Sequence, residues 1–295
     1  MRRPTPTRRD YLLATVSLVA PACWGSQAPS PTSPQAQDTL AGIEARVGGR
    51  VGVFALNTGT GAQLGSRADE RFAMCSTFKW LLAALVLTHV DRGTLTLDER
   101  LPYDSSHLLE YAPVTRQHVG EGSLSVGALA EASITLSDNT AANLLLDKLG
   151  GPTALTHYAR SLGDPVTRLD RNEPTLNTNS PGDPRDTTSP RAMVGLMNRV
   201  LCGDALSPAS RQRLLGWLRA CQTGKRRLRA GLPQDWLIGN KTGSGERNAV
   251  NDVAIAEPPG RPPLLLAVYT SESSSSLERL ERAHAEVAQL VAREI

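Results

Sequence analysis

Apolar residues recur along this chain in two periods, and each period occupies its own part of the sequence. Short runs rich in Val, Ile and Leu, bounded by Gly, Pro or Asn, predict strands near both ends. Longer stretches with apolar positions three and four residues apart predict helices, mostly in the middle. The predicted strands are 51–56, 236–240, 249–257 and 263–271, and the predicted helices are 38–46, 73–90, 126–136, 139–149, 153–162, 189–201, 207–220 and 277–295.

This distribution favours an α/β (α+β) architecture. The simplest arrangement is an antiparallel sheet built from both chain termini and flanked by the terminal helices, with an all-helical lobe inserted between its strands. We expect a sheet lobe of residues 38–67 and 221–295, a helical lobe of residues 68–220, and an active site between the two. The helix predicted over 73–90 is apolar on nearly every side, so it belongs inside a core.

One internal segment, residues 168–186, follows neither period. It contains three prolines and no apolar pattern. A stretch of this length without structure of its own inside a compact domain is usually functional or disordered. Glu173 and Asn177 lie within it, and their spacing suits two polar side chains directed at one small object, such as a water molecule.

The first 37 residues are predicted to be an export signal and a linker. Arg8 and Arg9 precede an apolar run, 11–22, that is too short to span a bilayer. Paired arginines favour the twin-arginine route, and hence a periplasmic or secreted protein. Cys23 is an alternative lipid-attachment site, although the proline two positions before it fits such a site poorly. Residues 27–37, rich in Pro, Ser and Gln, predict the linker.

Composition and charge narrow the range of partners. The formal net charge is +3, and four arginines against one aspartate in the first 37 residues account for all of it. A protein that binds phosphates carries its basic excess in the folded part, so we expect no nucleic-acid partner. With 40% apolar and 21% charged residues the chain is globular in type, and after the leader no stretch reaches the roughly 18 apolar residues of a membrane span.

Cysteine and histidine usage predicts neither a disulfide framework nor a metal site. Cys75, Cys202 and Cys221 follow the leader, and three is an odd number. Cys202 and Cys221 could pair, but buried thiols are the simpler interpretation. The five histidines show no ligand spacing with the cysteines or with one another, so we expect no metal.

Two of the only four lysines fall inside short Ser/Thr/Gly motifs. Ser76 and Lys79 stand three residues apart at the start of the apolar helix, so the amine can approach the hydroxyl. An amine desolvated among apolar side chains can lose its proton at neutral pH and activate a serine. The alternative is a helix cap with a surface lysine, which conflicts with the Trp-Leu-Leu sequence that follows Lys79.

Two further motifs are ambiguous when each is taken singly. The Ser-Asp-Asn sequence at 137–139 precedes a predicted helix, where these residue types are preferred caps. The Lys-Thr-Gly-Ser-Gly sequence at 241–245 follows an apolar strand. Its lysine and hydroxyls would make a carboxylate-binding row, and its glycines would let a ligand approach closely. A glycine-rich hairpin turn explains the same residues.

Taken together, the three motifs have the order and spacing of the serine penicillin-recognising enzymes. From about residue 38 to residue 295 the chain resembles a class A β-lactamase. The sequence at 173–177 is similar to the family's loop that carries the water-activating glutamate, and Arg171 and Asp186 match the ion pair that closes this loop. Tyr111 resembles the aromatic wall of the family's site.

The resemblance implies hydrolysis of the β-lactam ring of penicillin- and cephalosporin-type antibiotics through a serine acyl-enzyme, and hence antibiotic resistance. Ser76 is then the nucleophile, its base is Lys79, Glu173 through a water, or both, and Ser137 relays a proton to the leaving nitrogen. Glu173 with Asn177 then activates the hydrolytic water. The implied partners are small-molecule β-lactams, without metal or other cofactor, and we expect a monomer. The residues implied to bind the substrate are Asn139, Asn177, Tyr111, Arg227, Lys241, Thr242 and Ser244, and the backbone N–H groups of Ser76 and Ser244 are implied to form the oxyanion hole.

The sequence departs from the family pattern at one position. Many members carry an arginine on the strand after the Lys-Thr-Gly motif, where this chain has Val250. Arg227 matches a position where other members place a substitute arginine, so we predict that it supports carboxylate binding. Arg226 and Arg229 are near enough to compete for that role, and a solvated basic run is the alternative.

Three other functions share parts of this pattern. A D-Ala-D-Ala carboxypeptidase or transpeptidase shares the three motifs and the acylation step, but lacks a deacylation pair such as Glu173 and Asn177. A β-lactam sensor acylates, stays acylated and needs a membrane span. A serine esterase carries Gly-x-Ser-x-Gly around its nucleophile, and the sequence around Ser76 does not. Glu173 and Asn177 therefore favour a β-lactamase.

Overall fold

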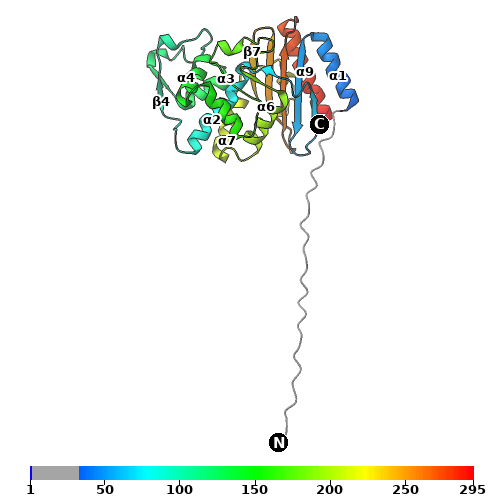
Figure 1. The fold of residues 1–295 in the computed structure, drawn as a ribbon, viewed down its shortest axis with the longest axis horizontal. Helices are drawn as coiled ribbons and strands as arrows, with labels where there is room; N and C mark the ends of the chain where they lie inside the picture. Colours follow the sequence, from blue (N-terminus) through cyan, green and yellow to red (C-terminus); the bar gives the residue numbers. More distant parts are fainter. Residues whose placement is uncertain (2–32) are drawn as a thin grey trace.

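A computed structural model shows a five-stranded sheet with helices on both of its faces and a larger helical part to one side (Figure 1). It describes residue 1 and residues 33–295. The strands are β1 Arg50–Asn57, β2 Gln63–Ser66, β3 Phe72–Ala73, β4 Arg100–Pro102, β5 Ser123–Ser125, β6 Thr187–Thr188, β7 Leu237–Gly245, β8 Ala249–Glu257 and β9 Leu264–Ser271. The helices are α1 Pro34–Val47, α2 Phe78–Asp91, α3 Val126–Thr135, α4 Asn139–Leu149, α5 Pro152–Ser161, α6 Pro190–Met197, α7 Pro208–Arg219, α8 Leu228–Gly231 and α9 Leu277–Glu294.

The main sheet joins strands from both ends of the chain. Its order is β2-β1-β9-β8-β7, and every neighbouring pair is antiparallel. β1 pairs with β9 along its whole length, from Arg50 opposite Ser271 to Asn57 opposite Leu264. The α+β fold with an antiparallel sheet built from both termini is thus confirmed. The division into lobes at 67/68 and 220/221 stays a proposal.

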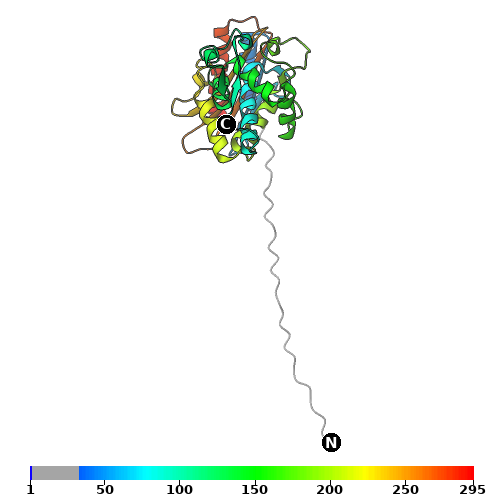
Figure 2. The same cartoon turned by 90° about the vertical axis from the view of Figure 1, so that its left-hand side faces the viewer.

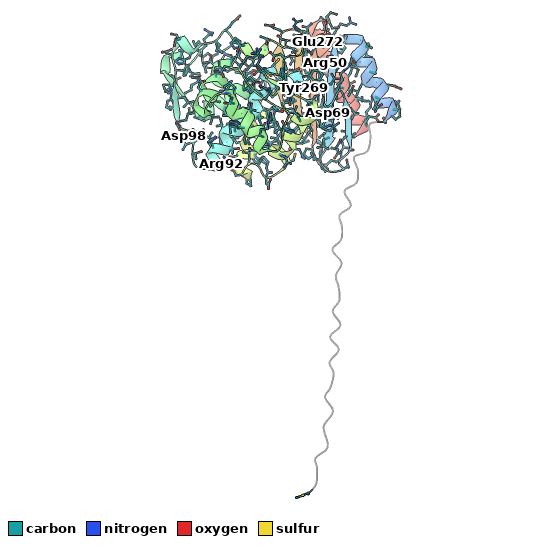
Figure 3. The ribbon with its side chains drawn as sticks, in the orientation of Figure 1. Arg50, Asp69, Arg92, Asp98, Tyr269 and Glu272 are labelled. Carbon is teal, nitrogen blue, oxygen red and sulfur yellow. The ribbon has the colours of Figure 1, made fainter. Side chains whose placement is uncertain are left out.

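Two hydrophobic cores lie on opposite faces of this sheet. The smaller one is formed by apolar side chains of α1, α8 and α9 with one face of the strands, and α1 and α9 lie along that face in Figure 1. The larger one surrounds α2, where all residues from Phe78 to Thr88 are buried. Figure 2 shows the helical part end-on. Tyr269 of β9 is fully buried in the interior, whereas Arg92 and Asp98 mark the outer edge (Figure 3).

The structure corrects several predicted boundaries. The helix predicted from residue 73 begins at Phe78, because Ala73 pairs in β3 and Cys75, with φ of +46°, opens a 3-10 turn over Cys75–Thr77. The helix predicted to reach residue 201 ends at Met197 and continues as a π-helical segment. Strands also occur in the middle of the chain, where β3 pairs with β6 and β4 with β5.

Of the predictions for the first 37 residues, the structure tests only the end of the linker, because residues 2–32 are not described. The linker was predicted to reach residue 37, but residues 34–37 form the first turn of α1, capped by the Ser33 side chain. The export signal and Cys23 lie outside the described residues. Within residues 33–295 no helix is long and apolar enough to cross a membrane. Cys202 and Cys221, whose pairing the sequence left open, are both free thiols, as is Cys75. The expectation of buried thiols is right for Cys221 and wrong for Cys202, which is exposed.

Candidate active site

The 3-10 turn before α2 carries Ser76, and the first turn of α2 carries Lys79. Asn251 of β8 holds the strand that leads into this turn, because its Nδ2 donates to the carbonyl oxygens of Ala73 and Met74 at 2.9 and 3.1 Å. The Ser76 side chain reaches the surface, whereas Lys79 is fully buried. The turn therefore presents a hydroxyl to the cavity, and the helix presents an amine to the interior of the site.

Ser76 and Lys79 converge on one carboxylate oxygen. Ser76 Oγ donates to Glu173 Oε1 at 3.0 Å, and Lys79 Nζ lies 3.0 Å from the same atom. Lys79 Nζ also donates to the Ser137 carbonyl oxygen at 2.9 Å and to Asn139 Oδ1 at 2.5 Å. The helical spacing of Ser76 and Lys79 thus brings both to Glu173, a residue 97 positions away in sequence from the serine.

The loop that sequence patterns leave unassigned is held tightly around Glu173. Asn177 Nδ2 donates to Glu173 Oε2 at 2.6 Å, so the two predicted loop residues do meet. Asn143 of α4 bonds both the backbone N–H and the backbone carbonyl of Glu173, at 3.0 and 2.9 Å. The predicted ion pair is present, with Arg171 Nε 2.5 Å from Asp186 Oδ2. These contacts fix the carboxylate beneath the serine, with the Glu173 side chain 0% exposed.

A second lysine approaches from the sheet. Lys241 of β7 is fully buried, and its Nζ donates to Ser137 Oγ at 3.0 Å and to the Thr242 carbonyl oxygen at 2.8 Å. Ser137 lies just before α4 with φ of +60°. Asp138 holds this turn, because its carboxylate caps α4 at Ala141 N and accepts from the N–H groups of Val114 and Thr115. The capping interpretation of the Ser-Asp-Asn motif is therefore right for Asp138.

Burial dominates the electrostatics of the two lysines and the glutamate. Desolvation lowers the pKa of Lys79, against the opposing charge of Glu173. Desolvation likewise lowers the pKa of Lys241, to about 7. Burial by itself would raise the pKa of Glu173, but the nearby Lys79 charge and hydrogen bonds from Lys79, Asn177 and Ser76 outweigh it, so the net shift is downward. The site therefore holds an ionised carboxylate beside amines that release protons readily.

The Lys-Thr-Gly-Ser motif lies on β7 along one side of the site. It is strand and not a hairpin turn, because β7 pairs with β8 through Gly245. Arg227 Nη2 donates to Ser244 Oγ at 2.9 Å, and its Nη1 donates to the carbonyl oxygens of Gly243 and Asn251. Val250 lies opposite Ser244 in the β7–β8 register, and its side chain packs in the smaller core. Arg227, from the segment before α8, thus places a guanidinium beside Ser244, whose β8 partner Val250 is apolar.

Its two neighbours in sequence point elsewhere. Arg226 is mostly exposed and pairs with Glu281, and Arg229 donates to Ile238 O and Asn240 Oδ1. Only Arg227 of the three lines the cavity. Of the three, Arg227 is therefore the arginine placed to contact a ligand in the cavity.

A cavity of about 350 Å³ joins these groups. Lys79, Glu173 and Lys241 lie buried beneath it, and Tyr111, half exposed, lies at its rim. Its lining residues are Ser76, Tyr111, Ser137, Asn139, Asn177, Thr223, Gly224, Arg227, Thr242, Gly243 and Ser244. All the predicted site residues therefore either line this cavity or form its floor.

Three contributors were missed from the sequence. Asn143 stands four residues after Asn139 on α4, and helical spacing could have indicated it. Thr223, whose Oγ1 lies 2.7 Å from Thr242 Oγ1, and Asn251 of β8 carry no such signal. Their parts in the site depend on contacts between segments far apart in the chain.

Comparisons with known proteins agree with this geometry. The model of the "Beta-lactamase enzyme family" matches residues 35–295. The chain is 42% identical to β-lactamase Toho-1 of Escherichia coli, covering 96% of this chain and 97% of that one. It is 45% identical to β-lactamase L2 of Stenotrophomonas maltophilia, over 91% and 88% of the two chains. The solved structure of an ancestral (GNCA) class A β-lactamase superposes with a TM-score of 0.86 at 56% identity, covering 87% of this chain and 98% of that one.

A cavity serine bonded to a buried glutamate and followed by a buried lysine, between a sheet and a helical part, is the arrangement of a serine penicillin-recognising enzyme. Within that class, the chain belongs to the class A β-lactamases.

Proposed function

We propose that this protein hydrolyses the β-lactam ring of penicillin- and cephalosporin-type antibiotics through an acyl-enzyme on Ser76, and so confers antibiotic resistance. The observation that carries the proposal is the convergence of the Ser76 hydroxyl, the Lys79 amine and the Asn177 amide on the Glu173 carboxylate, beneath one cavity. The same carboxylate can serve both halves of the reaction, because it touches the nucleophile and lies beside Asn177.

In acylation, Ser76 Oγ attacks the lactam carbonyl carbon and the C–N bond breaks. The 3.0 Å hydrogen bond from Ser76 Oγ makes Glu173 the immediate acceptor of the hydroxyl proton. Glu173 passes this proton to Lys79, 3.0 Å away. The Ser137 hydroxyl protonates the leaving nitrogen and is reprotonated by Lys241 Nζ, 3.0 Å from its Oγ, because Lys79 contacts only the backbone carbonyl oxygen of Ser137. The oxyanion is bound by the backbone N–H groups of Ser76 and Ser244.

In deacylation, a water held by Glu173 and Asn177 attacks the ester carbonyl. Glu173 accepts the proton of this water, the bond to Ser76 Oγ breaks, and the proton returns to that oxygen. Asn177 Oδ1 is buried and has no protein partner within residues 33–295, so an acceptor remains for the second hydrogen of the water. The resting enzyme and an opened ring result.

Substrate binding is assigned to the groups around the reacting atoms. Lys241, Thr242, Ser244 and Arg227 bind the substrate carboxylate, where two buried cations and two hydroxyls make a charge-assisted site. Asn139 bonds the side-chain amide of the substrate and positions Lys79. Tyr111 forms the apolar wall. We further propose that the enzyme is a monomer exported by the twin-arginine route, without a lipid anchor at Cys23.

The alternative, a D-Ala-D-Ala carboxypeptidase or transpeptidase, would form the same ester. In such an enzyme, a carboxylate held against the nucleophile by Asn143, Asn177 and the Arg171–Asp186 pair would have no function in deacylation. The decisive measurement therefore follows the fate of the ester.

The test is a time course with a chromogenic cephalosporin, combined with mass spectrometry of the intact protein. Wild type should turn over many equivalents. Glu173→Gln should acylate more slowly, with Lys79 as the remaining base, and then stall after about one equivalent with the mass of the acyl adduct, its turnover lower by roughly 10²–10⁴-fold. Glu278→Gln, at an exposed position on α9, is the matched control and should behave as wild type. A single burst from wild type would support the alternative, and sustained turnover by Glu173→Gln would remove Glu173 from the mechanism.

A further inference from the structure

Two hydroxyl groups meet beside the groups that are proposed to bind the substrate carboxylate. Thr242 of β7 is one of those groups, and its Oγ1 lies 2.7 Å from Thr223 Oγ1. Thr223 belongs to the segment between α7 and α8, and both threonines line the cavity. Within residues 33–295, Thr242 Oγ1 has no other hydrogen-bond partner. A ligand in the cavity therefore meets a hydroxyl that is already bonded to a second hydroxyl.

The surroundings hold the oxygen atoms of both hydroxyls in place. The Thr242 methyl group packs closely against Gly224, where a Cβ would lie only 2.5 Å from Thr242 Cγ2. Asn240 lies two residues before Thr242 on β7, and so on the same face, and its Nδ2 reaches the Thr223 carbonyl oxygen at 3.4 Å. β7 thus contacts both the backbone and the side chain of Thr223. The two hydroxyl hydrogens remain free to rotate.

The direction of the hydrogen bond between the two hydroxyls decides what Thr242 presents to a ligand. Each hydroxyl has one hydrogen to donate, and an ionised carboxylate only accepts. If Thr242 donates to Thr223, only its lone pairs face the ligand. If Thr223 donates to Thr242, the Thr242 hydrogen can point at the ligand, and the two bonds strengthen each other as members of one chain. Only the second direction suits a carboxylate.

Cys221 holds the other side of the Thr223 hydroxyl. It is buried, and its Sγ lies 3.2 Å from Thr223 Oγ1 and 3.7 Å from the Thr223 carbonyl oxygen. A thiol is a weak donor and a weak acceptor, so it competes poorly for the Thr223 hydrogen. The Thr242 oxygen, a stronger acceptor at 2.7 Å, is therefore the better partner for that hydrogen when a carboxylate is bound.

We propose that Thr223 is a positioning residue for recognition of the substrate carboxylate: its hydroxyl donates to Thr242 Oγ1 and so directs the Thr242 hydrogen at the carboxylate. This inference rests on the proposed function, in which Thr242 binds that carboxylate. The aligned hydroxyls favour an anion over a neutral group at the same place, because hydrogen bonds to charged acceptors are roughly twice as strong.

The experiment measures kcat and KM for a penicillin and for its carboxylate methyl ester. Thr223→Val removes the hydroxyl and keeps the shape of the side chain. KM for the penicillin should rise roughly three- to tenfold, the net value of one hydrogen bond, with kcat within about twofold of wild type. With the ester, which presents no anion, kcat/KM should stay within about twofold.

Two variants complete this comparison. Thr223→Ser keeps the hydroxyl and should restore the wild-type KM. Thr39→Val is the matched control, because the Thr39 hydroxyl on α1 donates to the Gln35 carbonyl oxygen of its own helix, and both substrates should behave as with wild type.

A second measurement separates an effect through Thr242 from a direct contact with the substrate. In a Thr242→Val background, Thr223→Val should cause no further loss, because the group through which it acts is already absent. Losses that multiply would show that Thr223 acts independently of Thr242, and would overturn the inference.

Two other results would overturn it while leaving the hydrolase assignment intact: an unchanged KM for the penicillin in Thr223→Val, or an equal loss with penicillin and ester, which is what a merely structural residue would show. If Thr223→Val does not fold, Thr223→Ala removes the same hydroxyl from this partly buried position and gives the same comparison. Wild type that fails to turn over would instead refute the proposed function, and the inference with it.

Discussion

Replacing Gly243 by alanine would force β7 away from the nucleophile. A Cβ at this position would lie 2.7 Å from the carbonyl oxygen of Met74, 3.1 Å from Cys75 Cβ and 3.2 Å from the backbone nitrogen of Ser76. Ordinary contact begins near 3.4 Å, so the strand or the turn must move by roughly 0.7 Å. Both are held, the turn by Asn251 and the strand by its pairing with β8, so the displacement cannot be absorbed locally.

That movement would widen the gap between Ser76 and Ser244, where the oxyanion is proposed to bind. Because a misplacement of about 1 Å can cost on the order of 100-fold in rate, we expect kcat/KM for a chromogenic cephalosporin to fall roughly 10- to 100-fold in Gly243→Ala. Overpacking should also lower the free energy of unfolding by about 1–3 kcal/mol. Stopped-flow acylation and urea denaturation would measure the two effects separately.

Gly216→Ala is the matched control for this change. Gly216 lies on α7 with nothing within 4 Å of its Cβ position, so alanine should leave kcat/KM unchanged and stabilise the helix by up to about 1 kcal/mol. Activity of Gly243→Ala within twofold of wild type would refute the reasoning, because it would show that the close approach of β7 to the nucleophile is not required.

Two further outcomes are expected. Arg227→Ala should raise KM for penicillins roughly tenfold, because the guanidinium beside Ser244 is lost. Arg226→Ala, at an exposed position, is the control, and its KM should stay within twofold of wild type. An unchanged KM in Arg227→Ala would contradict the assignment of Arg227 to the substrate carboxylate. His284 is fully buried, donates through Nε2 to the Val250 carbonyl, and burial together with the Arg227 charge lowers its pKa from 6.5 to about 3. Below pH 6.5 the unfolded chain therefore binds a proton that the folded protein does not, so this group should lower the free energy of unfolding by about 2.3 kcal/mol between pH 6.5 and 4.5. Urea titrations at both pH values should show this fall in wild type and not in His284→Gln, and an equal fall in both proteins would contradict it.

Local patterns in the sequence identified most of the regular elements. The helix over Asn139–Leu149 and the strand over Ala249–Glu257 have the predicted bounds. Each lies between clear signals, because an Asp cap and a glycine with positive φ bound the helix. Where a boundary depends on a distant partner, prediction failed. Its local sequence places Ala73 in a helix, but in the structure Ala73 belongs to β3, which pairs with β6. The local sequence of the Lys-Thr-Gly motif fits a turn as well as a strand, and only its pairing with β8 shows that it is a strand.

The chemical groups of the site could also be predicted, because three short motifs and a Glu-x-x-x-Asn spacing limit the chemistry to few possibilities. Their arrangement could not. Among Arg226, Arg227 and Arg229, only packing of α8 against β7, β8 and α9 decides which guanidinium reaches Ser244. Nothing local marks Thr223 or Asn251 as neighbours of the site.

The amino-acid order alone thus indicated most of the elements, the candidate nucleophile and its candidate partners, since helix caps, apolar periods and motif spacings act over a few residues. Tertiary structure decided which carboxylate meets Ser76 and which arginine meets Ser244. These pairings depend on contacts between segments tens to about a hundred residues apart in the chain. The same contacts remove buried side chains such as Lys241 from water, and this desolvation shifts their pKa values.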